Sequence, residues 1–262
     1  MIPKIIHYCW LSGEEYPQDI KNNIASWKAL LPDYEFMLWD TNRFDISTNI
    51  WTQQAFEKNK FAFAADFIRL HAVYTYGGIY MDTDVEVLKS FNDLLHLPYF
   101  VGSQYDNFIE PAIFGSEKKS SWILNCLQYY NERPFIKENG TYDTLDLPKV
   151  MKSHMEGIRN IIIMKDSQVQ KAESLLINKD CLYLFPSEYF SPKNYESGKV
   201  SSTKNTYTIH HYNSAWLPFF SRFRRNLKKA IGVNKVDKII SFLRLKKLLK
   251  FLYVLEKKLD SK

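Results

Sequence analysis

The stretch from residue 61 to residue 84 restricts the fold of this chain more than any other part of the sequence. Apolar side chains recur at helical spacing across residues 61–76 and predict a helix. Gly77-Gly78 follows, and glycine at this place is typical of a helix end. The run Ile79-Tyr-Met81 then predicts a short strand, with Asp82-Thr-Asp84 directly after it. A helix, a turn and a strand in such close succession favour an α/β fold.

The rest of the chain continues this alternation. Short apolar runs predict strands, and apolar stripes at helical spacing predict helices. Further strands are expected at 4–10, 34–40, 85–88, 99–101, 161–164 and 181–185, and further helices at 18–30 and 118–131. Residues 136–148 read as loop. The predicted class is therefore α/β, with a single mainly parallel central sheet flanked by helices.

The charges are distributed unevenly along the chain. Residues 217–262 carry 14 Lys and Arg against 3 Asp and Glu, whereas residues 1–216 carry 21 against 26. A mildly acidic body therefore ends in a strongly basic tail. We place the body at residues 1–220 and the tail at residues 221–262. The length of 262 residues suits one domain with such an appendage.

The tail has the pattern of an amphipathic helix. Arg222, Arg224 and Arg225 open it, and Gly232 is expected to break the helix. Leucines, isoleucines and lysines then divide the remaining positions between an apolar and a basic face. This pattern predicts binding to an anionic membrane surface. The alternative is a helix that packs on the body with its charges solvated. Nucleic acid is disfavoured, because no base-reading motif accompanies the charge.

The apolar runs and the cysteines of the sequence indicate the cellular compartment of the protein. No apolar run reaches the roughly 18 residues that a membrane span needs. The first 13 residues are too short in apolar run and too weakly basic for a secretory signal. Cys9, Cys126 and Cys181 are odd in number and widely spaced, which fits neither a disulfide framework nor a zinc site. We expect a cytoplasmic protein.

Asp82 and Asp84 lie two residues apart, so in an extended segment they point to the same side. Two carboxylates held together repel one another unless a cation lies between them. Mg²⁺ and Mn²⁺ take carboxylate oxygens and phosphate oxygens alike. The pair therefore favours a metal site that binds a diphosphate, with a solvated acidic turn as the alternative.

The same residues allow a second chemistry. Ile79-Tyr-Met-Asp82-Thr-Asp84 also matches the nucleophile loop of haloacid-dehalogenase-like phosphatases, in which Asp82 would attack a phosphoryl group. That loop normally follows the first strand of its domain. Here two predicted strands precede it, and no Asp-Asp pair follows downstream. The metal interpretation is therefore preferred.

The block from Asp66-Phe-Ile-Arg69 to Asp82-Thr-Asp84 resembles the sugar-binding region of DXD-containing glycosyltransferases. The resemblance is to the family 32 group, which includes capsular and lipopolysaccharide sugar transferases, and more distantly to the glucosylating domains of large clostridial toxins. Asp66 and Arg69 stand i, i+3 on one helix face. The resemblance implies that they hydrogen-bond the donor sugar. An ion pair on the helix surface is the alternative.

Two further blocks carry the resemblance. Ile2-Pro-Lys-Ile-Ile-His-Tyr-Cys-Trp10 resembles the opening strand of the family, which implies that Trp10 lies against the nucleotide base; a core tryptophan is the alternative. Residues 209–216 resemble its closing motif. This implies that His211 is a metal ligand and that Ser214 and Trp216 bind the diphosphate. His210 could be the ligand instead.

The resemblance implies a GT-A-type nucleotide-diphospho-sugar transferase fold and a retaining glycosyltransferase. Asp82, Asp84 and His211 would hold Mn²⁺ or Mg²⁺, and the donor would be a UDP-hexose. The tail favours a lipid-linked surface-polysaccharide acceptor and a position on the inner face of the cell membrane. A protein acceptor and a non-catalytic lectin-like module remain alternatives. The match is weakest at residues 104–148, which we expect to shape the acceptor site.

Overall fold

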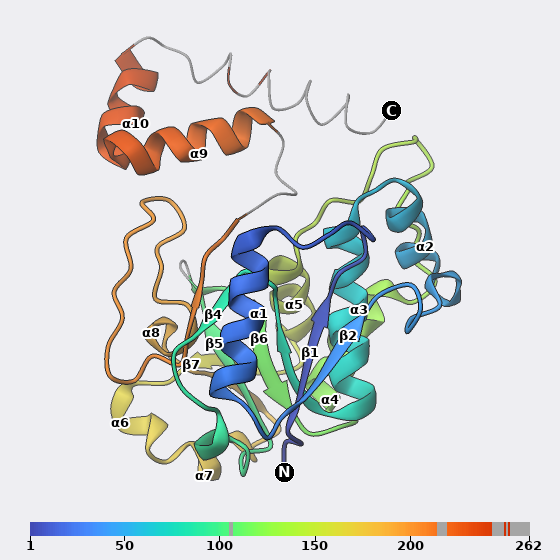
Figure 1. Ribbon diagram of the computed structural model, residues 1–262, viewed down its shortest axis with the longest axis vertical. Helices are drawn as coiled ribbons and strands as arrows, with labels where there is room; N and C mark the ends of the chain where they lie inside the picture. The colour runs from blue at the N-terminus through green and yellow to red at the C-terminus, as the bar shows by residue number, and fades with distance from the viewer. Residues whose placement is uncertain (105–106, 214–218, 243–248, 250, 252–262) are drawn as a thin grey trace.

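A five-stranded sheet forms the centre of the protein. The computed structural model describes residues 1–104, 107–213, 219–242, 249 and 251 (Figure 1). The strands lie in the order β2 (Glu35–Trp39), β1 (Ile5–Cys9), β3 (Gly78–Met81), β6 (Ile109–Ser116) and β5 (Tyr99–Ser103). β1 pairs in parallel with both β2 and β3, while β6 pairs antiparallel with β3 and with β5. Four strands therefore share one direction, and the prediction of a mainly parallel sheet is confirmed.

Two smaller pairs of strands extend the architecture. β4 (Val85–Val87) pairs antiparallel with β9 (Thr208–His210), and β7 (Asn160–Ile163) pairs in parallel with β8 (Cys181–Leu184). The β4–β9 pair joins the segment just after the two aspartates to a segment more than a hundred residues later. This pairing positions the candidate site.

Helices flank the sheet. α1 (Gln18–Leu30) packs against β4, α3 (Phe61–Tyr76) packs against β1 and β3, and α5 (Leu147–Met155) packs against β6 (Figure 1). The other α-helices in the described residues are α2 (Ile50–Glu57), α4 (Ser121–Leu127), α6 (Asp166–Val169), α7 (Ala172–Leu176), α8 (Ser187–Phe190), α9 (Phe219–Ile231) and α10 (Val233–Phe242). Short 3₁₀ turns lie at Ile46–Thr48, Asn92–Leu94 and Gln128–Tyr130. The core contains fully buried aromatic side chains, among them Trp27, Trp51 and Trp122.

The double glycine has a steric cause. Gly77 and Gly78 adopt φ values of 69° and 103°, which side chains rarely tolerate. A Cβ on Gly78 would lie 2.7 Å from the carbonyl oxygen of Ile5, and one on Gly77 would lie 2.9 Å from the amide nitrogen of Lys118. The chain can therefore turn from α3 directly into β3 only with glycine at both positions.

Several elements were absent from the sequence prediction, among them α2, α8, β9, β6 and α5. Residues 109–116 form β6, where the sequence pattern indicated no strand. Residues 147–155 form α5, whose first two residues lie in the predicted loop 136–148. β6 is buried at all eight of its positions, so it carries no polar and apolar alternation to reveal it. α5 begins after Asp146 and has Pro148 in its first turn.

The tail begins with two helices. α9 and α10 are separated by Gly232, which has a φ of 95°, at the predicted break. α9 contacts the body: Lys228 pairs with Glu196 at 3.0 Å, and Arg225 donates to the carbonyl oxygen of Asn213 at 3.3 Å. The continuation of the amphipathic tail beyond Phe242 lies almost entirely outside the described residues.

Candidate active site

The two aspartates meet a histidine from the far end of the chain. β3 ends at Met81, so Asp82 and Asp84 lie at the edge of the sheet where its parallel strands end. β9 pairs with β4 so that His210 lies opposite Val85. As a result, one potential ligand atom each of Asp82, Asp84 and His210 lies within 4.8 Å of the others. Two segments that are distant in sequence thus form one cluster.

His211, the residue expected as the ligand, lies in a different environment. Its Nε2 is 2.8 Å from Oε2 of Glu86, and its Nδ1 accepts from Nζ of Lys193 at 3.2 Å. Successive side chains along an extended segment point to opposite faces, so only one of two neighbouring histidines can face the aspartates. The structure brings His210 to this position. The sequence left His210 open as the alternative ligand, and the geometry favours His210 over His211.

Asp84 is fixed by the segment after β9. The backbone N–H of Asn213 donates to its Oδ2 at 2.8 Å, and Nε2 of His210 lies 3.5 Å from its Oδ1. Between these two residues, Tyr212 has a positive φ of 54°, a conformation unusual for a bulky residue. Strained backbone of this kind concentrates at functional sites.

Arg69 joins the predicted sugar-binding pair to the first aspartate. Its Nη1 lies 3.1 Å from Oδ2 of Asp82, and its Nη2 lies 3.2 Å from Oδ1 of Asp66. Tyr80 donates to the other oxygen of Asp82 at 2.7 Å. Asp66 and Arg69 are both buried, so they are not an ion pair on the helix surface. The three charged residues form one cluster, which shares Asp82 with the metal-ligand candidates.

Burial controls the protonation of this cluster. It raises the pKa of Asp66 to about 7, although the charge of Arg69 opposes the shift. It also raises the pKa of Asp82, again against Arg69. Burial alone would lower the pKa of His210, but the carboxylates of Asp84 and Glu110 together raise it to about 9. The acids around His210 therefore favour its protonated form.

Glu110 belongs to the candidate site, although no sequence motif predicted a role for it. It lies on β6, is completely buried, and faces Nδ1 of His210 at 3.4 Å. Burial would raise its pKa, but the charge of His210 and hydrogen bonds from His210, Ser191 and Ala112 hold it below the ordinary value. The one signal available in the sequence was an acid within an otherwise apolar run, Phe108-Ile-Glu-Pro-Ala-Ile-Phe114.

Among the remaining predicted residues, the structure describes the surroundings of Trp10. Trp10 follows β1 at the same edge of the sheet and is partly buried; its Nε1 donates to the carbonyl oxygen of Glu14 at 2.7 Å, and its ring lies 5.0 Å from that of Tyr16. Ser214 and Trp216 lie outside the described residues.

The donor set suits a hard divalent cation. Two carboxylates and one imidazole meet at Asp82, Asp84 and His210, and each is only partly buried. Carboxylate oxygens are ligands of both Mg²⁺ and Mn²⁺, and imidazole suits many transition metals. These residues fit the metal that a DXD pair implies.

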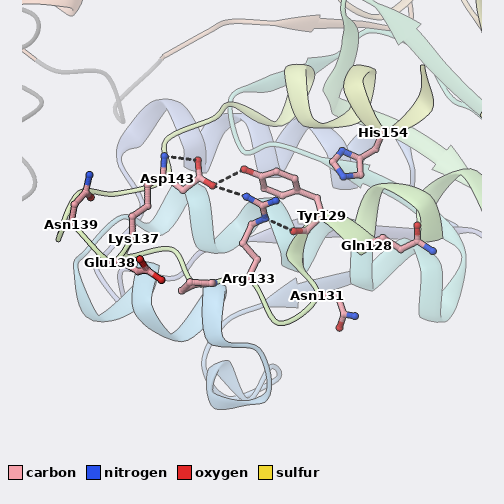
Figure 2. A pocket seen from close by; sticks show the side chains of 10 residues that line it. Gln128, Tyr129, Asn131, Arg133, Lys137, Glu138, Asn139, Asp143 and His154 are labelled. Carbon is pink, nitrogen blue, oxygen red and sulfur yellow. Dashed lines mark hydrogen bonds and ion pairs between the residues drawn. The ribbon is translucent and has the colours of Figure 1, made fainter. Parts of the chain in front are cut away.

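A separate polar hollow lies between the segments 128–143 and the end of α5 (Figure 2). It measures about 710 Å³ and contains none of the metal-ligand candidates. Within it, Asp143 accepts from the hydroxyl of Tyr129 at 2.9 Å and from Nη1 of Arg133 at 3.2 Å (Figure 2). Lys137 lies 3.5 Å from the other oxygen of Asp143. These partners already balance the negative charge of Asp143.

Comparison with known protein families gives a match in the N-terminal part of the chain. Residues 17–101 match the family model described as "Glycosyltransferase sugar-binding region containing DXD motif". This range contains Asp66, Arg69, Asp82 and Asp84. The predicted resemblance is therefore confirmed, and the match does not favour the phosphatase alternative.

Individual relatives agree with this match. Inositol phosphoceramide mannosyltransferase 3 of Schizosaccharomyces pombe is 32% identical over 131 residues, which cover 48% of this chain and 36% of the relative. The chain thus spans about a third of that protein's length. The uncharacterized glycosyltransferase L373 of Acanthamoeba polyphaga mimivirus is 24% identical over 215 residues, covering 75% and 84% of the two chains. Among solved structures, the PaToxG glycosyltransferase aligns with a TM-score of 0.46 at 19% identity, over 66% of this chain and 75% of that one.

Proposed function

Since residues 17–101 carry the DXD-containing sugar-binding region of glycosyltransferases, we propose that this chain is a metal-dependent retaining glycosyltransferase that moves a hexose from a nucleotide-diphosphate sugar to a glycan acceptor. The observation that carries the proposal is the cluster of Asp82, Asp84 and His210 beside the buried pair Asp66 and Arg69. These residues come from three separate parts of the sequence and converge at one edge of the sheet.

Each group has a distinct task in this proposal. Asp82, Asp84 and His210 would hold Mn²⁺ or Mg²⁺, which when bound neutralises negative charge on the departing diphosphate. Arg69 contacts both Asp66 and Asp82, so it fixes the carboxylate assigned to the sugar relative to the carboxylate assigned to the metal. Such preorganisation of charged groups lowers a reaction barrier by avoiding reorganisation during the reaction. Trp10 would lie against the nucleotide base.

The acceptor proposal draws on the relatives. The mannosyltransferase from Schizosaccharomyces pombe is named for inositol phosphoceramide, a lipid. We therefore propose a lipid-linked glycan or glycolipid acceptor for this chain, with a surface-polysaccharide intermediate as the first class to test. UDP-hexose is the proposed donor, and the relative's name adds mannose to the sugars that a test must include.

Metal-dependent hydrolysis of the donor tests the function without an acceptor. We expect one of UDP-glucose, UDP-galactose and GDP-mannose to be hydrolysed with Mn²⁺ present and not with EDTA. Release of UDP or GDP, measured by a coupled assay, gives the rate. Equal, metal-independent rates for all donors would contradict the proposal. Phosphate release from a generic phosphoester would favour the phosphatase alternative instead.

The tail supports a membrane-surface location. None of the helices in the described part of the chain is long and apolar enough to span a bilayer. α9 instead exposes Phe223, Leu227 and Ile231, which are 58%, 37% and 41% accessible and recur every four residues along one face. Arg222 and Arg224 are exposed beside this stripe. We propose that the stripe enters an anionic bilayer, on the cytoplasmic side of the cell membrane.

Replacement of the stripe tests this location. In the full chain, changing Phe223, Leu227 and Ile231 together to serine should lower partitioning onto anionic phospholipid vesicles at least tenfold, because the apolar area that enters the bilayer is lost. Sedimentation with vesicles measures the bound fraction. Ile177→Ser, at an exposed apolar residue beside α7, is the matched control and should change nothing. Unchanged partitioning of the triple variant would refute the membrane role of α9.

A further inference from the structure

Four polar groups contact the carboxylate of Glu110 inside the protein. The N–H of Ala112 donates to its Oε1 at 2.9 Å, and the hydroxyl of Ser191 donates to its Oε2. The hydroxyl of Tyr212 lies 3.3 Å from Oε2, and Nδ1 of His210 lies 3.4 Å away. A buried carboxylate is costly unless it is paired and hydrogen-bonded, and here both conditions are met. The carboxylate is therefore held in one place.

His210 spans the distance between this carboxylate and the metal-ligand candidates. Its Nδ1 faces Glu110, and its Nε2 lies 3.5 Å from Oδ1 of Asp84. Glu110 has no accessible surface, so it cannot itself contact a substrate. Any influence of Glu110 on the reaction must therefore pass through a neighbour, and His210 is the neighbour that reaches the cluster.

The ring of His210 is also held on its face. The ring of Tyr212 lies 3.9 Å from it between centroids, and the hydroxyl of Tyr212 contacts both Glu110 and Ser191. Tyr212 keeps this position in a left-handed backbone conformation, with a φ of 54°. Glu110, together with the hydroxyl and the ring of Tyr212, therefore holds the imidazole of His210 in one orientation.

We propose that Glu110 is a positioning residue, which accepts the Nδ1 proton of His210 and thereby directs Nε2 at a divalent cation held with Asp82 and Asp84. Carboxylates that orient a metal-bound histidine in this way fix its tautomer and raise its basicity, and their loss typically costs 10- to 100-fold in metal affinity or activity. This inference rests on the proposed metal-dependent function. It adds a residue from β6, an element outside the sequence motif.

Mn²⁺ binding tests the proposal directly. Electron paramagnetic resonance of free Mn²⁺, with UDP and with GDP present, gives the dissociation constant of the full-length protein. Glu110→Gln keeps the size of the side chain and removes its charge, and should weaken Mn²⁺ binding at least tenfold. Spin-echo modulation from imidazole nitrogen on the bound Mn²⁺ should also decrease. Glu110→Asp keeps the charge but withdraws it from His210, and should weaken binding in the same direction.

A double-mutant cycle separates positioning from general destabilisation. In a His210→Ala background, Glu110→Gln should cause no further loss of Mn²⁺ affinity. Asp143→Asn, at another buried acid in the separate hollow that contains none of the metal-ligand candidates, is the matched control and should lower thermal stability without changing Mn²⁺ affinity. Equal losses from Glu110→Gln in both backgrounds, or no loss in either, would overturn the positioning role. Wild-type protein that binds no Mn²⁺ would instead overturn the proposed function itself.

Discussion

Replacing Asp84 by alanine should reduce metal-dependent donor hydrolysis and sugar transfer at least about 10³-fold. Charge stabilisation by a bound metal contributes several kcal/mol to such a reaction, and each 1.36 kcal/mol changes a rate tenfold. Asp84 presents one oxygen to His210 and the other to the backbone N–H of Asn213. Its removal therefore deletes a candidate ligand and also releases the segment that follows β9.

The fold should survive this change. Asp84 lies after β3 at the edge of the sheet, and His210 keeps its second partner, Glu110. We expect the melting temperature without metal to change by only a few degrees, while the added stability from Mn²⁺ and nucleotide disappears. Asp33→Ala, which removes an exposed acid paired with Lys4, is the control and should retain full activity. Wild-type turnover of the Asp84→Ala variant at saturating Mn²⁺ would refute the metal role.

Local patterns in the sequence were enough to predict the part of the site around β3. The helix 61–76, the double glycine and the short strand each have a signal within a few residues, and the structure forms α3 and β3 where these signals lie. Asp66 and Arg69 share a helix face by spacing alone. What the spacing did not reveal was burial, because their depth depends on α4, on β6 and on the other elements packed around α3.

The histidine assignment shows where local patterns fail. His210 and His211 are adjacent, so the choice between them depends on the register of β9 against β4, which no nearby residue encodes. Glu110 was missed for a similar reason: its partners Ser191, His210 and Tyr212 are all at least 80 residues away in sequence. Long-range pairing of strands creates these contacts, and a single sequence does not display it.

The buried Arg69 should contribute more to stability at high pH than any exposed ion pair of the molecule. Arg69→Met leaves the buried Asp66 and the partly buried Asp82 without their shared cation, and losing one partner of a buried pair costs about 3–5 kcal/mol in the free energy of unfolding. The cost applies only when the acids are ionised. In the wild-type protein burial already raises the pKa of Asp66 to about 7 against the opposing charge of Arg69, and without that charge it rises further.

The direction of the pH dependence follows from this shift. When folding raises the pKa of a carboxyl, the protein loses stability as the pH rises from the pKa of that carboxyl in the unfolded state to its pKa in the folded state. Wild type and variant share this loss below pH 7, where Asp66 is still protonated when folded. Above pH 7 only the variant continues to lose stability. The deficit of Arg69→Met should therefore be larger near pH 9 than at pH 5.5, because Asp66 ionises between these two pH values.

Urea unfolding in EDTA at the two pH values measures this difference without interference from metal. Arg133→Met is the matched control, because Arg133 pairs with Asp143 but is 44% accessible, and an exposed partner contributes less than about 1 kcal/mol. A deficit of equal size at pH 5.5 and pH 9 would mean that Arg69 acts only through packing, for example against the ring of Tyr80 at 4.8 Å. A deficit that opens above pH 7 would instead establish Arg69 as the counter-charge that holds Asp66 and Asp82 next to the candidate metal site.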